Sequence, residues 1–283
     1  MTNINDKRIT KSFTIDLLHF KKEIIMKIGF IGYGNMASAI AKGLINYANF
    51  DAKDINACAR DYSKLVNNCN LLGINPCANA SEVIKQSDMV ILATKPYQIA
   101  DIIKDNKSSL INKIVISIAA GIYYDDLETM LLEGTHHLST IPNTPIVTGK
   151  GILITEAKHS LSNEEYDLFL TLFSKIALIE VVDTKHFSIA GTIAGCTPAF
   201  TAMYLEALGD AGVKYGLTRA QSYRLAAKMI EGTGALYLSE AKHPGALKDA
   251  VCSPGGTTIK GVASLEKDGF RGVIINAIDA IEG

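Results

Sequence analysis

The sequence lacks the features that mark several large classes of protein. Its 28 basic and 29 acidic residues leave a formal net charge of -1 and are mixed along the chain, so no basic patch for nucleic acid or for an anionic membrane is expected. No apolar run approaches the roughly 18 to 20 residues that span a bilayer. No G-x-S-x-G motif occurs, which argues against a serine hydrolase of the nucleophile-elbow type.

Cysteine is also too sparse and too irregularly spaced to build a framework. The five cysteines are an odd number with no CxxC pair, at Cys58, Cys69, Cys77, Cys196 and Cys252. This pattern favours reduced thiols in a cytoplasmic protein over disulfides, and it predicts no metal site.

The chain is long enough to form about two domains. It has 283 residues, of which 48% are hydrophobic and 20% charged, at about 150 residues per domain. We expect an α/β architecture in which a Rossmann-type, doubly wound parallel sheet at residues 26–183 precedes an all-α domain at residues 184–283.

Residues 1–25 are interpreted as an N-terminal appendage that is not part of the fold. They mix basic and acidic residues and lack the apolar core and cleavage site of a secretory signal. Met26 then leads directly into an apolar strand. A short helix at residues 15–25 that binds a membrane surface or a partner is the alternative.

A dinucleotide fingerprint follows the first strand. Residues 28–31 are apolar, and Gly32, Gly34 and Ala37 form a G-x-G-x-x-A motif around Asn35 and Met36. The first glycine permits a tight turn, the second lets the backbone approach a pyrophosphate, and the alanine lets the helix lie close to the strand. Such a motif is weak evidence alone, because glycines also serve ordinary turns.

The pattern that continues downstream strengthens this interpretation. Apolar strands are predicted at residues 55–59, 89–93 and 114–118, with helices at 62–69 and 80–87 between them, which is the βαβ rhythm of a parallel sheet. The second strand ends at Arg60, where NAD-binding sites usually carry an acidic residue. Arg60 favours the 2′-phosphate of NADP, whereas Asp61 keeps NAD open and Arg60 as a plain surface charge is the alternative.

The second half changes to helical periodicity after an apolar strand at residues 176–182. Helices are predicted at 197–212 and from a capping box at Thr218 and Gln221 to about residue 238. Their apolar residues lie on more than one face, so they must be covered on several sides. We expect a second copy of the chain to cover them, and a bundle closed within one chain is the alternative.

A hexapeptide at Ser253–Thr258, SPGGTT, is the most informative stretch of this half. Proline suits a first helical turn, paired glycines remove side chains, and hydroxyls supply hydrogen-bond donors. The segment predicts a helix N-terminus open to an anion such as a carboxylate. A well-capped helix start without chemistry is the alternative.

Together these motifs resemble one family, the pyrroline-5-carboxylate reductases. The resemblance covers nearly all of the chain from Met26 onward. It is carried by IGFIGYGNMASAI at 28–40, Asn79, ILATKP at 91–96, SIAAGI at 117–122, PNTP at 142–145, PAF at 198–200 and VCSPGGTTI at 251–259.

The resemblance implies reduction of 1-pyrroline-5-carboxylate to L-proline, the last step of proline biosynthesis, by hydride transfer from NADPH, with NADH as an alternative. It implies a homodimer through the helical domain, with assemblies of dimers left open. The implied cofactor residues are Gly32, Gly34, Asn35, Met36, Ala37, Arg60, Asn79, Ala93, Lys95, Pro96, Ala119, Gly121 and Asn143. The implied substrate residues are Ser253, Gly255, Gly256, Thr257 and Thr258, with the Thr258 hydroxyl acting in catalysis by a hydrogen bond to the imine nitrogen.

Three departures from the family pattern fall at positions that border the substrate side in the family. We interpret them as ordinary packing substitutions, because Cys196 and Cys252 are close in size to Ser and Thr, and an altered substrate or activity is the alternative. The family usually shows Ser-Gly-Ser-Gly-Pro-Ala where this chain has Cys196 and Thr197 within AGCTPA, Arg where it has Ser139, and Thr where it has Cys252. A related imine or β-hydroxyacid dehydrogenase is one rival function, although no lysine lies in the G-x-x-x-N-x-x-K context of the hydroxyacid enzymes. A non-catalytic NADP-binding sensor is the other.

Overall fold

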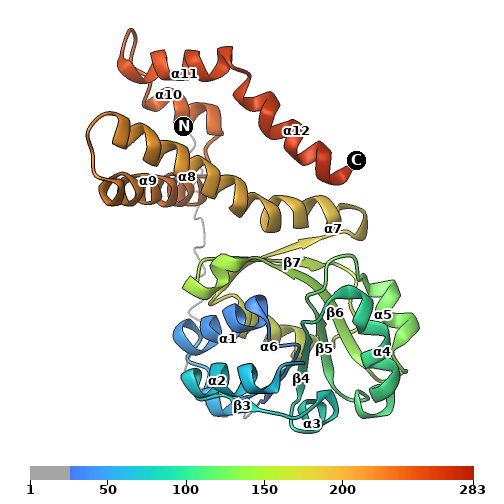
Figure 1. Ribbon diagram of the computed structural model, residues 1–283. Helices are drawn as coiled ribbons and strands as arrows, with labels where there is room; N and C mark the ends of the chain where they lie inside the picture. The colour runs from blue at the N-terminus through green and yellow to red at the C-terminus, as the bar shows by residue number, and fades with distance from the viewer. Residues whose placement is uncertain (1–25) are drawn as a thin grey trace, which may run out of the picture.

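The computed structural model describes residues 26–283 as a sheet half and a helical half (Figure 1). The two interpretations of residues 1–25 lie outside the described residues. The strands are β1 (Ile28–Ile31), β2 (Ile55–Cys58), β3 (Asn75–Pro76), β4 (Met89–Leu92), β5 (Ile114–Ser117), β6 (His136–Pro142), β7 (Gly151–Glu156) and β8 (Ala177–Val182).

Helices cover this sheet and then form the second half alone. The sheet half contains α1 (Asn35–Tyr47), α2 (Tyr62–Leu72), α3 (Ala80–Lys85), α4 (Pro96–Asn106), α5 (Tyr124–Met130), α6 (Asn163–Phe173) and the 3-10 turns η1 (Ala52–Asp54), η2 (Lys107–Ser109) and η3 (Thr144–Thr148). The helical half contains α7 (Thr184–Gly191), the π-helix η4 (Thr192–Cys196), α8 (Thr197–Lys214), α9 (Arg219–Glu240), α10 (Pro244–Ala250), α11 (Thr257–Lys267) and α12 (Phe270–Glu282).

The eight strands form one sheet in the order β3-β2-β1-β4-β5-β6-β7-β8. β1 lies between β2 and β4, with Ile28 opposite Ile55 on one side and Met89 on the other. The doubly wound sheet is confirmed, with one correction: β6 and β7 are antiparallel. Only the short η3 turn connects them, whereas a parallel pair needs a crossover of a dozen or more residues.

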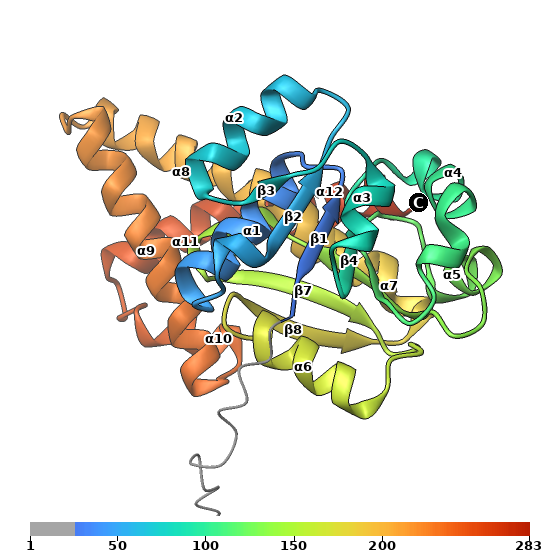
Figure 2. The same cartoon turned by 90° about the horizontal axis from the view of Figure 1, so that it is seen from below.

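Alternating side chains of the strands build two apolar layers. Phe30 and Ile91 face a layer that includes α1, α2 and α6, whereas Ile31 and Val90 face α3, α4 and α5. Figure 2 shows α1 and α2 on one side of the strands and α3, α4 and α5 on the other. Burial on both faces explains why these strands are continuously apolar in sequence.

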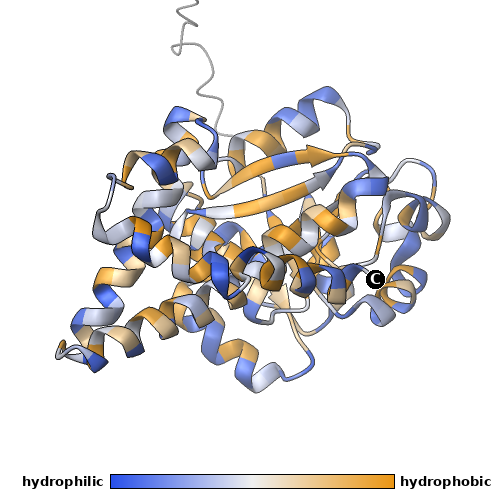
Figure 3. Cartoon of the chain, turned by 90° about the horizontal axis from the view of Figure 1, so that it is seen from above, coloured by the Kyte–Doolittle hydropathy of each residue, from blue (hydrophilic) through white to orange (hydrophobic). Residues whose placement is uncertain are grey.

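The helical half leaves much of its apolar surface uncovered within one chain. Orange segments recur along its helices in Figure 3. The exposed large side chains include Met203, Tyr204, Leu225, Met229, Leu236, Leu238, Val273 and Ile275. The described chain therefore does not close this bundle by itself, contrary to the single-chain alternative. No helix within residues 26–283 has the length and apolarity needed to cross a membrane.

The two halves meet where α7 and η4 pack on β6 and β7. Phe187 of α7, Ala194 of η4 and Ile154 of β7 form a small buried cluster. The contact is close, because a Cβ atom on Gly191 would come within 2.5 Å of the Ile141 Cδ1 atom. This junction fixes the direction in which the helical half leaves the sheet.

Candidate active site

A cleft of about 980 Å³ lies at the carboxyl ends of β1, β2, β4 and β5. Ligands of open α/β sheets bind at this edge, where the strand order reverses. The structure brings eleven of the thirteen predicted cofactor residues together in its wall: Gly32, Gly34, Asn35, Met36, Ala37, Arg60, Asn79, Ala93, Lys95, Pro96 and Ala119.

The two fingerprint glycines are needed for different reasons. Gly32 has φ +91°, and a Cβ atom there would lie 2.9 Å from the Ala93 carbonyl oxygen. Any side chain at Gly32 would therefore strain the turn. At Gly34 nothing in the described chain lies within 4 Å of a built Cβ atom, so the space in front of it is open to a ligand.

The α1 helix begins at this open space without a side-chain cap. Its N-cap residue, Gly34, supplies no acceptor for the first backbone N–H groups. By contrast, Asp61 caps α2 and Asn79 caps α3 through side-chain oxygens. Free N–H groups and the helix dipole together make the start of α1 fit the pyrophosphate of a dinucleotide.

The rim of the cleft beyond β2 carries cationic side chains. Arg60 and Lys64 both line it, together with Asp61. The Asp61 Oδ1 atom accepts a hydrogen bond from the Lys64 backbone N–H at 2.9 Å. Its carboxylate is thus engaged at the start of α2, while the Arg60 guanidinium is exposed.

The opposite wall of the cleft is formed by residues that follow β3 and β4. It offers the side-chain amide of Asn79, the hydroxyl of Thr94 and the ammonium group of Lys95. Asn79 uses its Oδ1 atom to accept from the Glu82 N–H at 3.0 Å, which leaves its NH₂ group for a ligand. Thr94 lines the same wall, and its Oγ1 atom is buried without a hydrogen-bond partner in the described chain. Sequence reasoning missed Thr94, Lys64 and Thr144 as lining residues, although Thr94 lies inside the ILATKP motif.

Two predicted cofactor residues do not reach the cleft. Gly121 follows the lining residues Ala119 and Ala120 but is not itself part of the wall. Asn143 is only 5% exposed, and both ends of its side-chain amide are used within the chain, by Ile152 and Ala194. Its neighbour Thr144 lines the cleft instead.

The predicted substrate segment lies in the helical half, away from this cleft (Figure 1). The wall of the cleft includes no residue beyond Thr144. Ser253 and Thr258 are exposed, and α11 begins at Thr257 with Gly256 as an N-cap residue that offers no side-chain acceptor. Like the start of α1, this helix start leaves its first N–H groups free for an anion.

Pro254 does not occupy the first helical turn as predicted. The Gly256 N–H donates to the Ser253 carbonyl at 3.0 Å, and Gly255 has φ +71°. Pro254 and Gly255 are therefore the central residues of a turn with the Pro-Gly pattern of type II. The turn folds Ser253 back toward the start of α11.

The departures from the family pattern fall in different environments. Ser139 is fully buried in β6, and its hydroxyl has no hydrogen-bond partner in the described chain. Cys196 ends the π-helix, and the Thr197 hydroxyl donates to the Ile193 carbonyl one turn earlier. Cys252 is half-buried beside Ser253.

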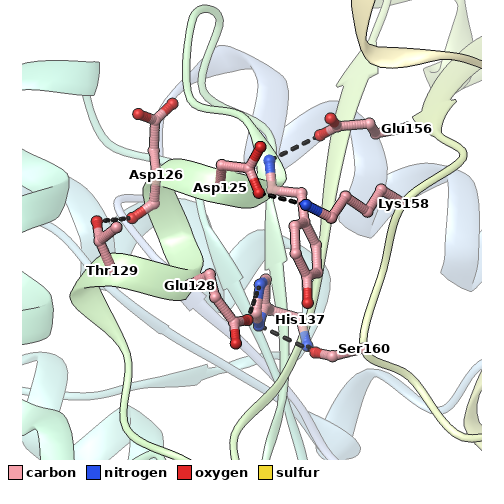
Figure 4. Close-up of polar contacts among 9 residues, drawn as sticks. Asp125, Asp126, Glu128, Thr129, His137, Glu156, Lys158 and Ser160 are labelled. Carbon is pink, nitrogen blue, oxygen red and sulfur yellow. Dashed lines mark hydrogen bonds and ion pairs between the residues drawn. The ribbon is translucent and has the colours of Figure 1, made fainter.

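A second polar cluster lies outside the cleft, around the start of α5 (Figure 4). The buried Glu156 carboxylate accepts from the Tyr124 N–H at 2.7 Å and from the Thr184 hydroxyl, so it ties α5 and α7 to the end of β7. The Ser160 hydroxyl lies 3.0 Å from Nδ1 of the buried His137. This cluster holds the start of α5 against the end of β7. No metal-binding group of three or more acidic, histidine or cysteine residues occurs among residues 26–283.

Family models match both halves of the chain. A family model described as "Pyrroline-5-carboxylate reductase dimerisation" matches residues 184–282. A second, described as "NADP oxidoreductase coenzyme F420-dependent", matches residues 27–121.

Relatives that match most of the chain include pyrroline-5-carboxylate reductases. The pyrroline-5-carboxylate reductase of Treponema pallidum (strain Nichols) is 45% identical over 259 residues, which is 90% of this chain and 98% of the relative. That of Escherichia coli (strain K12) is 36% identical over 254 residues, 89% of this chain and 94% of the relative. The crystal structure of Plasmodium falciparum pyrroline carboxylate reductase with NADP bound superposes with a TM-score of 0.81 at 30% identity, covering 90% of this chain and 95% of that one.

Proposed function

The chain belongs to the pyrroline-5-carboxylate reductase family, and from that premise we propose how its residues divide the reaction. The enzyme reduces 1-pyrroline-5-carboxylate to L-proline, the last step of proline biosynthesis, with NADPH as reductant. The sheet half at residues 26–183 holds the cofactor. The helical half at residues 184–283 supplies the dimer contacts and the segment Ser253–Thr258 that binds the substrate, called the substrate turn below.

The observation that carries this proposal is a pair of uncapped helix starts. The N-cap residues of α1 and α11 are Gly34 and Gly256, and neither offers a side-chain acceptor. The first faces a cleft of dinucleotide size and fits a pyrophosphate. The second, with the hydroxyls of Ser253, Thr257 and Thr258, fits the single carboxylate of the substrate.

When bound, NADPH would supply a hydride to the imine carbon, so that the C=N double bond becomes a single bond, while its π electron pair moves to the ring nitrogen and takes up one proton from solvent. The Thr258 hydroxyl donates a hydrogen bond to that nitrogen and orients the ring. The Ser253–Thr257 turn anchors the carboxylate. These residues act mainly by proximity and orientation, and no nucleophile is needed.

A homodimer is supported by the dimerisation match and by the uncovered apolar surface of α8 and α9. One chain does not bring its substrate turn to its own cleft, so we infer that each cleft receives the turn of the partner subunit. Larger assemblies of such dimers are compatible with this arrangement. Reduced cysteines in the described chain support a cytoplasmic location.

The proposal is tested by following the absorbance of reduced cofactor with and without racemic pyrroline-5-carboxylate. We expect imine-dependent NADPH oxidation with formation of proline, and weaker activity with NADH. A β-hydroxyacid that drives NADP reduction would support the hydroxyacid rival instead. Tight NADPH binding without oxidation would support the non-catalytic sensor.

A further inference from the structure

Asn143 stands at the junction between the cofactor half and the helical half. It follows β6 directly and precedes Thr144, which lines the cleft. Its backbone N–H donates to the Ile152 carbonyl at 3.1 Å, and its Oδ1 atom accepts from the Ile152 N–H at 2.8 Å. These bonds hold Asn143 rigidly against β7.

The remaining polar group of this side chain crosses to the helical half. The Asn143 Nδ2 atom donates to the Ala194 carbonyl at 3.0 Å. The bond is buried. It joins the edge of the cofactor cleft to the first part of the helical half, shortly after α7.

Ala194 belongs to the π-helix η4, the widened turn between α7 and α8. Such turns are short and often mark functional positions, because they depart from regular helical hydrogen bonding. Two carbonyls of this turn accept side-chain donors: Ala194 from Asn143, and Ile193 from the Thr197 hydroxyl. Asn143 therefore fastens the sheet to an irregular turn from which α8 departs.

The same turn is held from its other side by the last helix. The Thr192 hydroxyl of this turn donates to the Glu282 carboxylate of α12, as does the Ser188 hydroxyl of the preceding helix α7. α12 follows α11 directly, after a connection of residues 268–269, and the start of α11 carries Thr258. The π-helix thus connects the edge of the cofactor cleft, through Asn143, to the helices that carry the substrate turn.

We propose that Asn143 is a positioning residue for hydride transfer, not a cofactor ligand. Its amide sets the orientation of the helical half relative to the cofactor cleft and thereby the place of the substrate turn in the dimer. The inference rests on the proposed function, because it concerns the geometry of that reaction. A misplacement of about 1 Å at a reacting centre costs about a hundredfold in rate.

The test replaces Asn143 by aspartate in the full-length enzyme. Asn143→Asp keeps the Oδ1 acceptor for Ile152 but turns a carboxylate oxygen toward the Ala194 carbonyl. We expect kcat for the imine to fall about tenfold to a hundredfold at mildly alkaline pH. The dissociation constant for NADPH, measured by fluorescence titration, stays within about threefold of wild type, because both ends of the Asn143 amide are bonded within the chain.

Acid pH is expected to restore kcat in Asn143→Asp, whereas it would not restore a kcat that was lost through a general packing defect. Once protonated, the carboxyl group introduced by Asn143→Asp carries an O–H that donates to the Ala194 carbonyl, so kcat relative to wild type recovers as the pH falls. The hydrogen-bond partners of Asn143 are backbone groups, and the charged group that holds the same turn is Glu282. Dividing the kcat–pH profile of Asn143→Asp by that of the wild type removes the effects of groups that the two enzymes share.

Asn106→Asp is the matched control. The Asn106 Nδ2 atom also donates to a backbone carbonyl, that of Ile102 at 2.8 Å, but on α4, away from the junction. We expect wild-type kinetics at every pH. If Asn143→Asp does not fold, Thr192→Val tests the same turn from the side of α12 and is expected to lower kcat with unchanged NADPH binding.

Unchanged kcat in both junction variants would overturn the inference. A loss of NADPH affinity that parallels the loss of kcat in Asn143→Asp would also overturn it and make Asn143 a cofactor contact. Failure of the proposed function is a separate result, because it would show as a wild-type enzyme without imine-dependent oxidation of NADPH.

Discussion

The Asp61 carboxylate accepts the backbone N–H of Lys64 at 2.9 Å, so the acidic residue after β2 caps α2, while Arg60 stands exposed at the rim of the cleft. This relationship favours NADPH over NADH, because a charge-assisted bond to the 2′-phosphate contributes roughly 1.5 to 3 kcal/mol.

Arg60→Asp is therefore expected to weaken NADPH binding about tenfold to a hundredfold more than NADH binding, measured as dissociation constants for both cofactors. Lys104→Asp, an exposed charge reversal on α4 outside the cleft, is the control. Equal losses for the two cofactors would show that Arg60 is only a surface charge.

Replacing each of the two fingerprint glycines by alanine should separate an effect on NADPH binding from an effect on folding stability. At Gly34 the added methyl group meets nothing in the chain, so Gly34→Ala should keep the wild-type melting temperature and lose NADPH affinity at least about tenfold by obstructing the pyrophosphate. At Gly32 the positive φ and the close Ala93 carbonyl should cost about 1 to 3 kcal/mol of folding stability. Unchanged NADPH affinity in Gly34→Ala would place the pyrophosphate elsewhere.

Thr258 and Ser253 should affect different kinetic constants. Thr258→Val removes a hydrogen bond that strengthens as the ring nitrogen gains electron density, so kcat should fall about tenfold to a few hundredfold with NADPH binding unchanged. Ser253→Ala removes a carboxylate contact made equally in the ground and transition states, so it should chiefly raise KM. Wild-type kinetics in Thr258→Val would reduce the SPGGTT segment to a helix start without chemistry.

His137 should make the fold less stable in acid. It is 1% exposed, and burial lowers its pKa below the ordinary 6.5. Backbone hydrogen bonds at Thr135 and Tyr124 and the carboxylates of Glu128 and Glu156 oppose this shift. The Lys158 ammonium lies over the Tyr124 ring that stacks on His137.

The unfolded chain therefore binds a proton at His137 below about pH 6.5 that the folded chain resists, so the free energy of unfolding declines as the pH falls through that value. His137→Asn should flatten this decline in denaturant titrations across pH. His159, whose pKa burial also lowers, leaves a residual slope. An equally steep decline in the variant would assign the acid sensitivity to other groups.

The sequence predicted those features that depend on local pattern. Apolar runs and the glycine fingerprint located β1, β2, β4 and β5 and their cleft within one or two residues, because buried parallel strands and a phosphate-binding turn each impose a local signature. The antiparallel β7 was missed, because its direction depends on the length of the η3 connection.

Side-chain partners across the fold were not predictable. Asn143 lies in a motif beside the cleft, so the sequence indicated a cofactor contact, and only the folded chain shows that its amide reaches Ala194, 51 residues later. Pro254 was assigned to a helix for a similar reason, since Pro-Gly serves both helix starts and turns.

The most direct test of the composite site is complementation in mixed dimers. Gly34→Ala lacks a working cleft and Thr258→Val lacks a working substrate turn, so each homodimer should be weakly active. After subunit exchange, a mixed dimer pairs the intact cleft of one subunit with the intact turn of the other, and imine-dependent NADPH oxidation should rise well above the sum of the two parents. Activity that stays at that sum, with mixed dimers verified by mass, would contradict the account and place both halves of each site in one subunit.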